Sequence, residues 1–367
     1  MRIAILGTRG IPLGYSGYET LAAELARRLV ERGHPVTVYA YRHMFRSRPS
    51  DYQGARIRYQ RGMGGKRTAQ FSHSLRATLD VVFRRPDVVL FCNAANGVFG
   101  ILLRLARIRC VINVDGLEWR RPKWGRLARK WFRCGAWCAT RFFHRVVTDA
   151  VAMQAIYQRE FGCPTVCIAY GANLVVSRDP SCLARYGLAP RDYFLVVGRM
   201  VPDNNADLIV SAYRKSGSRK KLLVVGGTTY RDDYQERLRR QAGAGVVFSG
   251  YIDDQDVLNE LYGNAFAYIH GHEFGGTNPA LLRSLGAGCC VLALDTEFNR
   301  EVLASGRYGR LFRKDEGELA AQMRALEADA TQVNELRRLA PERIRQEYTW
   351  EKITEQYIEV FSALVRR

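Results

Sequence analysis

Short apolar runs alternate with amphipathic segments of helix length along most of the chain. The first run lies in RIAILGTRGIP (2–12), TLAAELARRLVERGH (20–34) follows with its leucines at helical spacing, and PVTVYA (35–40) is rich in β-branched residues. This order predicts a β-α-β unit, and units of this kind build parallel sheets. Three further strands are expected at 87–92, 110–115 and 145–149.

The same alternation begins again in the second half of the chain. Apolar runs there predict five strands, at 193–200, 221–227, 245–252, 265–270 and 289–295. Two consecutive doubly wound α/β domains are therefore expected, with a cleft between the carboxyl ends of their strands. We place them at residues 1–172 and 173–345, followed at 346–367 by an amphipathic helix that needs a surface to cover.

The positive charge of the chain is unevenly distributed. The formal net charge of the 367 residues is +20. Residues 1–170 hold 29 lysines and arginines against 10 acidic residues, whereas residues 171–367 hold 27 against 26. A positive field confined to one domain indicates docking to an anionic membrane, a polyphosphate lipid or nucleic acid. Because the sequence has no recognised nucleic-acid module or stacking platform, no nucleic acid is expected.

One predicted helix concentrates this charge. Between Arg120 and Arg145 there are nine lysines and arginines and no acidic residue. Apolar side chains fall on one face of this helix with arginines beside them: Leu127, Trp131, Cys134, Cys138 and Phe142, next to Arg126, Arg129 and Arg133. Such a helix can lie on anionic lipid, although a solvated basic face is the more common reason for a run of charge.

The sequence shows neither a membrane-spanning segment nor a metal-binding pattern. No apolar run reaches the roughly 18 residues that a spanning helix needs, and the first residues lack the long apolar region and cleavage site of a signal peptide. We therefore expect a cytoplasmic protein, peripheral at the inner face of the cell membrane. Nine cysteines are scattered without a CxxC pair, and His270 and His272 have no third ligand in view, so reduced thiols and no metal are expected.

The segment HGHEFGGTNPALLRSLGAG (270–288) predicts a phosphate-binding turn. Gly275 and Gly276 allow a ligand to approach the backbone, and Asn278 followed by proline is typical of a helix cap, with the helix at 279–287. The free N–H groups and the dipole of such a helix favour an anion. Glycines can also be needed for the geometry of the turn alone.

Other residues at the same predicted sheet edge suit a nucleoside diphosphate. Arg199 directly follows a strand, and a guanidinium can grip a diphosphate in a forked contact. Gly226 and Gly227 form a further turn that allows close approach, and Tyr251 and Ile252 offer a place for a base.

Long motifs across the whole chain resemble one known family. They are GTRGIP…SGYET, CNAANG, NVDGLEWRRPKW, VVGRMVPDNN, GYIDDQDVLNELYGNAFAYIHGH and GGTNPALL…LDTEFNREVL. The chain resembles GT-B glycosyltransferases of retaining family four, and more narrowly the rhamnosyltransferase-like branch of bacterial capsule and exopolysaccharide clusters. The resemblance implies two Rossmann-like domains that face each other across a cleft, and a terminal helix that returns to the first domain. It also implies a nucleotide-sugar donor in the second domain, an acceptor in the first and no cofactor or metal.

Several donor residues follow from the resemblance. Arg199 resembles the diphosphate-binding arginine of the family, and Asn204 stands where a lysine is usual. Gly275, Gly276, Thr277 and Asn278 resemble the donor loop, and His272 is expected to touch the donor phosphate or sugar. The paired glutamates of the family would fall at Gly275 and Arg283, so Glu273 is the candidate substitute for the first.

Arg283 is the main departure from the family pattern. The glutamate expected there accepts hydrogen bonds from ribose hydroxyls, and arginine has no acceptor. Arg283 either contacts a phosphate, faces solvent while the ribose is held otherwise, or marks a weakened enzyme. A deoxyribose donor such as a dTDP-sugar would lose least from this exchange, so dTDP is favoured.

Acceptor and catalytic candidates lie in the first domain. Asp115 ends a strand where many relatives place a histidine beside the reacting sugar, and Glu118 follows, so both are candidates to orient the acceptor or take its proton. The alternative is that Asp115 caps a turn. Glu19 either binds sugar hydroxyls or stabilises a helix N-terminus. The remaining acceptor candidates are Arg9, Gly10, Tyr15, Gly17, His73 and Trp119.

These observations predict a retaining glycosyltransferase. It would transfer a hexose, with rhamnose favoured, from a nucleoside diphosphate to a lipid-linked saccharide during synthesis of a bacterial surface polysaccharide. The alternative is a regulatory protein that binds a nucleotide-sugar with little or no turnover, which the departure at Arg283 suggests.

Overall fold

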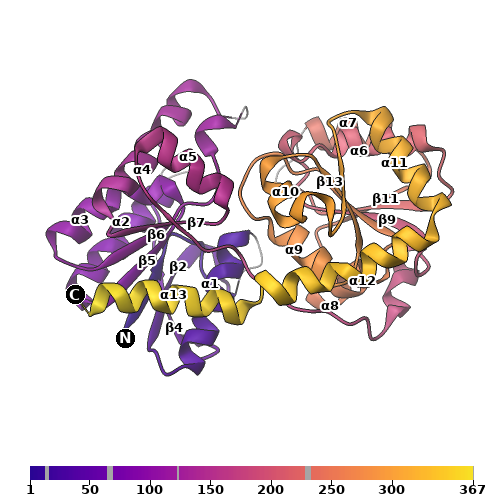
Figure 1. Cartoon of the computed structure of the whole chain (residues 1–367). Helices are drawn as coiled ribbons and strands as arrows, with labels where there is room; N and C mark the ends of the chain where they lie inside the picture. Colours follow the sequence, from indigo (N-terminus) through magenta and orange to yellow (C-terminus); the bar gives the residue numbers. More distant parts are fainter. Residues whose placement is uncertain (13–15, 64–68, 122–123, 228–232, 367) are drawn as a thin grey trace. The chain divides into compact units, whose positions relative to one another are not determined.

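The computed structural model describes residues 1–12, 16–63, 69–121, 124–227 and 233–366. The chain divides into two compact units, which are treated separately below (Figure 1). Unit 1 comprises Met1–Tyr170 together with Trp350–Arg367, and unit 2 comprises Gly171–Thr349. Each unit is built around one sheet.

Unit 1 contains an eight-stranded sheet in the order β3-β4-β2-β1-β5-β6-β7-β8, in which only the β3/β4 pair is antiparallel. Its strands are β1 (Ile3–Leu6), β2 (Val36–Tyr41), β3 (Asp51–Tyr52), β4 (Ala55–Gln60), β5 (Val88–Cys92), β6 (Cys110–Asn113), β7 (Arg145–Thr148) and β8 (Val166–Cys167). Its α-helices are α1 (Gly17–Glu31), α2 (Ala69–Arg84), α3 (Gly100–Leu105), α4 (Arg126–Phe142), α5 (Val151–Phe161) and α13 (Trp350–Val365). The central strands β1 and β5 are completely buried, as expected for a parallel sheet covered on both faces.

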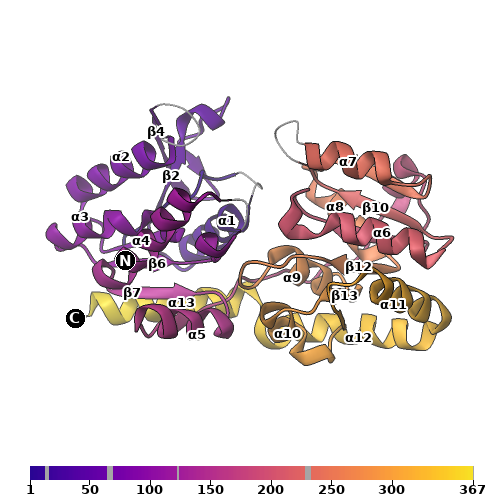
Figure 2. The ribbon, with the colours of Figure 1, turned by 90° about the horizontal axis from the view of Figure 1, so that it is seen from above.

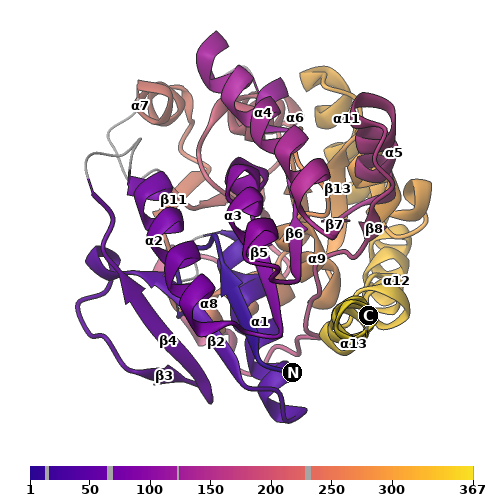
Figure 3. The ribbon, with the colours of Figure 1, turned by 90° about the vertical axis from the view of Figure 1, so that its left-hand side faces the viewer.

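The helices of unit 1 lie on both faces of this sheet. The chain crosses the sheet in one direction from β1 to β2 and in the other from β4 to β7, so right-handed crossovers place α1 opposite α2, α3 and α4. Figure 3 shows α2, α3 and α4 side by side. The terminal helix α13 packs against α1, where Arg28 Nε donates to Glu351 Oε1 at 3.1 Å, and the Tyr357 hydroxyl accepts from Asn113 Nδ2 at 2.9 Å.

Unit 2 contains a six-stranded, fully parallel sheet in the order β11-β10-β9-β12-β13-β14. Its strands are β9 (Tyr193–Val197), β10 (Lys221–Val225), β11 (Val246–Gly250), β12 (Ala267–His270), β13 (Cys290–Leu294) and β14 (Arg310–Phe312). Its helices are α6 (Ala206–Ser216), α7 (Asp233–Gln241), α8 (Gln255–Asn264), α9 (Pro279–Gly286), α10 (Glu297–Val302), α11 (Glu316–Ala328) and α12 (Ala330–Glu347), with α6 beside α11 and α9 beside α12 (Figure 2).

All ten strands expected from apolar runs are present, so the predicted doubly wound α/β class is confirmed for both units. The strands that the runs did not predict are β3, β4, β8 and β14. Strand β4 was missed because Ala55 and Ile57 are buried while Arg56 between them is exposed, which leaves no continuous apolar run. The others have only two or three residues.

Candidate active site

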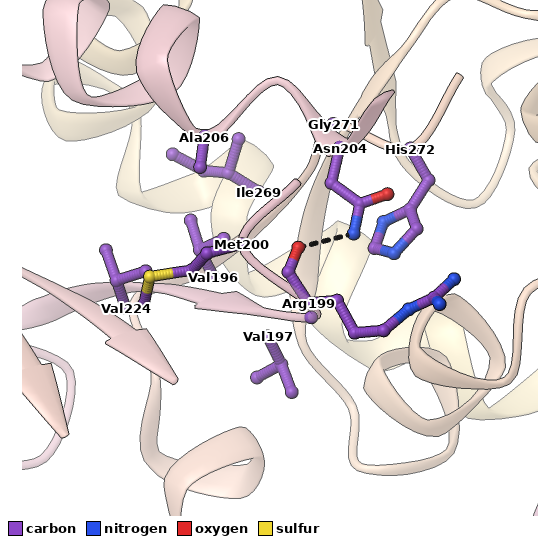
Figure 4. A pocket seen from close by; sticks show the side chains of 11 residues that line it. Val196, Val197, Arg199, Met200, Asn204, Ala206, Val224, Ile269, Gly271 and His272 are labelled. Carbon is purple, nitrogen blue, oxygen red and sulfur yellow. Dashed lines mark hydrogen bonds between the residues drawn. The ribbon is translucent and has the colours of Figure 1, made fainter. Parts of the chain in front are cut away.

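The candidate donor site lies where the chain reverses direction across the sheet of unit 2. Strands β9 and β12 are neighbours, yet the chain leaves them toward opposite edges of the sheet. Such a switch point leaves an open crevice at the carboxyl ends of the two strands. A pocket at this point is lined by Gly198 and Arg199 after β9, Asn204 before α6, and Gly271 and His272 after β12 (Figure 4).

Three glycines at this rim are explained by close packing of the backbone. A Cβ on Gly226, whose φ is +123°, would lie 2.0 Å from the carbonyl oxygen of Gly198. A Cβ on Gly271 would lie 2.4 Å from the carbonyl oxygen of Asn204, and one on Gly198 would lie 2.8 Å from the His272 ring. Close packing of the backbone therefore accounts for the glycine at position 226 without a ligand. Gly227 beside it is half-buried.

Arg199 is the predicted donor residue with the clearest geometry. Its side chain is exposed at the pocket and makes no hydrogen bond or ion pair with any residue that the structure describes. Its carbonyl oxygen accepts from Asn204 Nδ2 at 2.7 Å. Asn204 thus fixes the turn that presents the guanidinium, rather than replacing the missing lysine, and the guanidinium is available to an anion.

The predicted cap of the donor loop is confirmed. The Asn278 side chain accepts from Ala280 N at 2.9 Å and Pro279 is the first residue of α9. Gly275 has a φ of +124°, a conformation that favours glycine, and Thr277 is buried. The loop therefore leads directly into the positive end of α9, as an anion site requires.

Glu273 is engaged with a neighbour that the sequence did not single out. Its carboxylate forms a 2.6 Å ion pair with Lys314, which follows β14, and also accepts from Asn205 Nδ2 at 3.4 Å. The Glu273 N–H donates to the carbonyl oxygen of Asp203 at 3.1 Å. Glu273 therefore connects the donor loop to two other loops. To act on a substrate, its carboxylate would have to bind the substrate while it is paired with Lys314.

Arg283 is half-buried, and its guanidinium is held by α8 rather than extended freely into solvent. Nη1 donates to Gln255 Oε1 at 2.7 Å, and Nε and Nη2 donate to Asn259 Oδ1 at 3.1 and 2.6 Å. The guanidinium also lies over the ring of Tyr262, and burial lowers the pKa of Arg283. Helix α8 thus supplies acceptors to the Arg283 guanidinium, and its contact with the donor stays a prediction.

The remaining donor candidates lie at the ends of strands. Tyr251 follows the edge strand β11 and is 60% exposed, and Ile252 beside it is half-buried. His272 lines the pocket beside Arg199. An exposed aromatic ring at the rim suits a base, and the contact of His272 with a phosphate or sugar stays a prediction.

In unit 1, Asp115 belongs to a network of buried hydrogen bonds. Its Oδ2 accepts from the Tyr170 hydroxyl at 2.8 Å, and its carbonyl oxygen accepts from the Tyr18 hydroxyl at 2.9 Å. Asp149 is buried and acts on this carboxyl group, and burial raises the pKa of Asp115. Asp149 was missed, although it directly follows β7, the neighbour of the strand that Asp115 follows. The adjacent strand ends could have revealed this carboxyl pair.

Glu118 and Trp119 are held by structural contacts. Glu118 accepts from Trp124 Nε1 at 2.5 Å and forms a 3.1 Å ion pair with Arg121. Trp119 is buried, packs against Tyr157, and donates to Glu160 Oε2 at 3.2 Å. Trp119 therefore cannot contact an acceptor in this conformation, because its ring belongs to the core.

The loop between β1 and α1 is organised by Glu19. This carboxylate is 2% exposed and accepts from Arg9 N at 2.8 Å and from Ser16 Oγ at 2.5 Å. Its role as a structural anchor is thus favoured over sugar binding. Gly10 has a φ of +110° and lies against Ala40, Gly17 begins α1, and Tyr15 lies outside the described residues.

His73 was expected to line the acceptor side, but the structure places it in the core. It has no exposed surface, and its ring centroid lies 3.8 Å from that of Tyr41. His73 lies on the buried face of α2, so it cannot contact an acceptor in this conformation. Burial lowers the pKa of His73 to about 4.

We expect His73 to make unit 1 sensitive to acid. The pKa of His73 is about 6.5 in the unfolded chain and about 4 in the folded one, so between these pH values the unfolded chain binds a proton that the folded chain does not bind. The free energy of unfolding therefore falls as the pH falls. From pH 7 to pH 5 the decrease is about 2 kcal/mol. Urea unfolding of His73→Leu should show a pH dependence smaller by that amount, whereas an unchanged dependence would contradict the assignment.

Among the described residues, no cluster of three or more histidine, cysteine or acidic side chains could hold a metal ion. Within the same residues, no helix is both long and apolar enough to cross a bilayer.

Solved structures define the class of this fold. Sucrose-phosphate synthase from Thermosynechococcus elongatus superposes with a TM-score of 0.82 at 18% identity, over 99% of both chains. HepE from Anabaena, solved in complex with UDP, superposes with a TM-score of 0.79 at 18% identity, over 99% of this chain and 100% of HepE. The protein has the GT-B fold of glycosyltransferases.

Two sequence-family models match the chain and agree with this class. Residues 15–174 match Glycosyltransferase Family 4, and residues 191–329 match Glycosyl transferases group 1. Both parts of the chain thus match models of glycosyltransferases, one of Family 4 and one of group 1.

Two curated relatives cover parts of the chain. The phosphatidyl-myo-inositol mannosyltransferase of Mycolicibacterium smegmatis is 28% identical over 238 residues, which are 61% of this chain and 59% of that protein. An uncharacterized glycosyltransferase of Methanocaldococcus jannaschii is 27% identical over 181 residues, 46% of this chain and 44% of that protein. The matched regions thus span about half the length of these relatives.

Proposed function

We propose that the protein is a retaining glycosyltransferase that transfers a hexose, with rhamnose favoured, from a nucleoside diphosphate to a lipid-linked saccharide in the synthesis of a bacterial surface polysaccharide. The observation that supports this most is the Arg199 guanidinium at the switch point of unit 2, which has no side-chain partner among the described residues. HepE, which shares the fold, binds UDP, and this supports a nucleotide-sugar donor.

The catalytic contribution is electrostatic. As the bond between the sugar and the diphosphate breaks, negative charge develops on the leaving phosphate, and donors that are already in place stabilise it without reorganisation. Arg199 supplies charge-assisted hydrogen bonds, and the capped N-terminus of α9 supplies its dipole. We assign no protein nucleophile and no metal.

The acceptor is proposed to bind unit 1 near Asp115. Burial raises the pKa of Asp115 and so favours its protonated form, which suits orientation of a sugar hydroxyl better than proton abstraction. The named activity of the mycobacterial relative, which acts on phosphatidyl-myo-inositol, supports a lipid-bearing acceptor. The cationic field of residues 1–170 supports attachment to the inner face of the cell membrane.

Release of a nucleoside diphosphate tests the proposal. The preferred base is found first, by thermal shift with dTDP, UDP, GDP and ADP, because a bound ligand stabilises the folded chain. The matching nucleotide-sugar is then offered with membrane lipid extracts, and the diphosphate is measured. Release that depends on Arg199 would support a transferase. Binding without release from any donor and acceptor would favour the regulatory protein that the state of Arg283 suggests.

Arg283 is expected to set the preference for the sugar of the nucleotide. The Arg283 guanidinium is held by Asn259 and Gln255 and has no acceptor to offer the ribose. We therefore expect dTDP to bind at least as tightly as UDP. Arg283→Glu should restore an acceptor and shift the ratio of UDP to dTDP affinity by about tenfold toward UDP, which is the effect of one or two hydrogen bonds. Isothermal titration measures both affinities.

The matched control is Arg283→Gln, which removes the charge but offers a weaker acceptor. It should shift the ratio less than Arg283→Glu does. An identical ratio in wild type and Arg283→Glu would remove this residue from the ribose site.

A further inference from the structure

Three aromatic side chains form a column that leads from the core of unit 2 to the donor pocket. Tyr268, His270 and His272 are alternate residues, so they fall on the same side of β12 and of the segment that follows it. Tyr268 and His270 have no exposed surface, whereas His272 is half-buried and lines the pocket. The column therefore connects two buried side chains to a third that can contact a ligand.

Its members touch in sequence. The Tyr268 hydroxyl and His270 Nδ1 are 2.9 Å apart and share a hydrogen bond. The rings of His270 and His272 are stacked, with centroids 4.4 Å apart and planes inclined by 13°. On the other side, a Cβ on Gly198 would lie 2.8 Å from the Cε1 atom of His272. The His272 ring is thus held between His270 and the backbone at the end of β9.

The choice of histidine at position 270 is costly for folding. His270 Nε2 is buried and has no hydrogen-bond partner among the residues that the structure describes, and leaving a buried polar atom unpaired is unfavourable. Burial and the neighbouring His272 also lower the pKa of His270 well below its ordinary value, so the ring is neutral. A phenylalanine would fill the same space without an unpaired atom, so packing alone does not explain this residue.

We propose that Tyr268 and His270 are positioning residues that hold the imidazole of His272 against the donor, so that it contacts a phosphate or a sugar hydroxyl beside Arg199. This inference rests on the proposed donor site. Tyr268 fixes the ring of His270, and His270 fixes the plane of His272. Neither residue touches the ligand.

A double-mutant cycle tests the positioning role. The affinities of wild type, His270→Ala, His272→Ala and the double variant for dTDP and for UDP are measured by isothermal titration. Each single substitution should weaken binding by about tenfold, the effect of one hydrogen bond to a charged group. If His270 acts through His272, the double variant binds no more weakly than His272→Ala. Independent losses, which multiply to about 100-fold, would overturn the proposal.

A second measurement covers the case in which His270→Ala does not fold. Tyr268→Phe deletes only the anchoring hydroxyl, and it should weaken binding a few-fold in the wild-type background and not at all in His272→Ala. Tyr193→Phe is the matched control. Tyr193 lies in β9, and its buried hydroxyl donates to the Leu261 carbonyl oxygen of α8 at 2.6 Å rather than to a member of the column. Tyr193→Phe should lower stability and leave affinity unchanged, and an equal loss of affinity in both variants would overturn the proposal.

A spectroscopic readout needs no nucleotide. With ¹⁵N-labelled histidine, the ring signals of His272 should shift in Tyr268→Phe and stay unchanged in Tyr193→Phe, and the opposite pattern would overturn the column. Failure of the column and failure of the donor site are distinguishable. If Arg199→Ala abolishes binding while the cycle shows independent losses, only the positioning role of the column is wrong. If Arg199→Ala binds the nucleotide with wild-type affinity, the donor site itself is wrong.

Discussion

Replacing Arg199 with alanine is expected to weaken binding of dTDP and UDP by about 100-fold. Two parallel charge-assisted hydrogen bonds from a guanidinium to a diphosphate contribute about 3 kcal/mol together, which corresponds to that factor. Because the Arg199 guanidinium has no other partner among the described residues, its removal leaves no protein group unpaired, and the loss reports on the ligand alone. Isothermal titration at fixed ionic strength measures it.

Two further variants define the cause of this loss. Arg199→Lys keeps the charge but loses the fork, so its affinity should fall between those of the wild type and Arg199→Ala. Arg338→Ala removes another exposed arginine, from α12, and should bind like the wild type. If Arg199→Ala bound both nucleotides with wild-type affinity, the switch-point pocket would not be the donor site.

The position of Arg199 could be predicted from the sequence, and the reason is topological. Parallel strands end at the same edge of a sheet, so a residue that directly follows an apolar run is assigned to that edge without knowledge of its neighbours. The same reasoning located the Asn278 cap, whose partner lies two residues away in the chain. Local hydrogen bonds of this kind are set by the sequence next to them.

Partners that are distant in sequence could not be predicted in this way. Arg283 is held by residues 24 and 28 positions earlier, and Glu273 pairs with a lysine 41 positions later. Which acceptor a long side chain reaches depends on the packing of α8 against α9, and apolar spacing does not encode that choice. His73 was misplaced for the same reason, since a polar residue on the inner face of a helix looks identical to one on an exposed face until the helix is docked.

The basic helix α4 is divided in a way that its sequence did not reveal. Its second half packs through small residues, and a Cβ on Gly135 would lie 2.6 Å from the Ala94 carbonyl oxygen. Cys138 is buried there, so the predicted apolar face is not continuous. In the first half, Leu127 and Trp131 are 84% and 43% exposed, and Trp131 contacts the exposed ring of Phe71 on α2. The first half of α4 is therefore the part that can meet a membrane.

Reversing the charge of three exposed residues on this half, Arg126, Lys130 and Arg133, is expected to lower binding to anionic vesicles by at least about 100-fold. Each lysine or arginine near an anionic surface contributes about 1 kcal/mol, so the loss of three attractions alone reaches that factor, and the new glutamates add repulsion. Lys130 is chosen in place of Arg129, because Arg129 Nε donates to the Trp124 carbonyl oxygen at 2.9 Å and its loss could disturb the fold. Sedimentation with phosphatidylglycerol-containing vesicles measures the partition.

The control carries the same change in net charge elsewhere. Exposed Arg237, Arg240 and Arg338 of unit 2, changed together to glutamate, should leave vesicle binding nearly intact, because screening confines a surface charge to roughly 8–10 Å at physiological salt. Equal losses in the two triple variants would mean that net charge, rather than this helix, drives attachment. Wild-type binding to uncharged phosphatidylcholine vesicles that matched binding to anionic ones would contradict the electrostatic basis itself, and would leave Leu127, Trp131 and Phe71 as the groups that hold the protein on lipid.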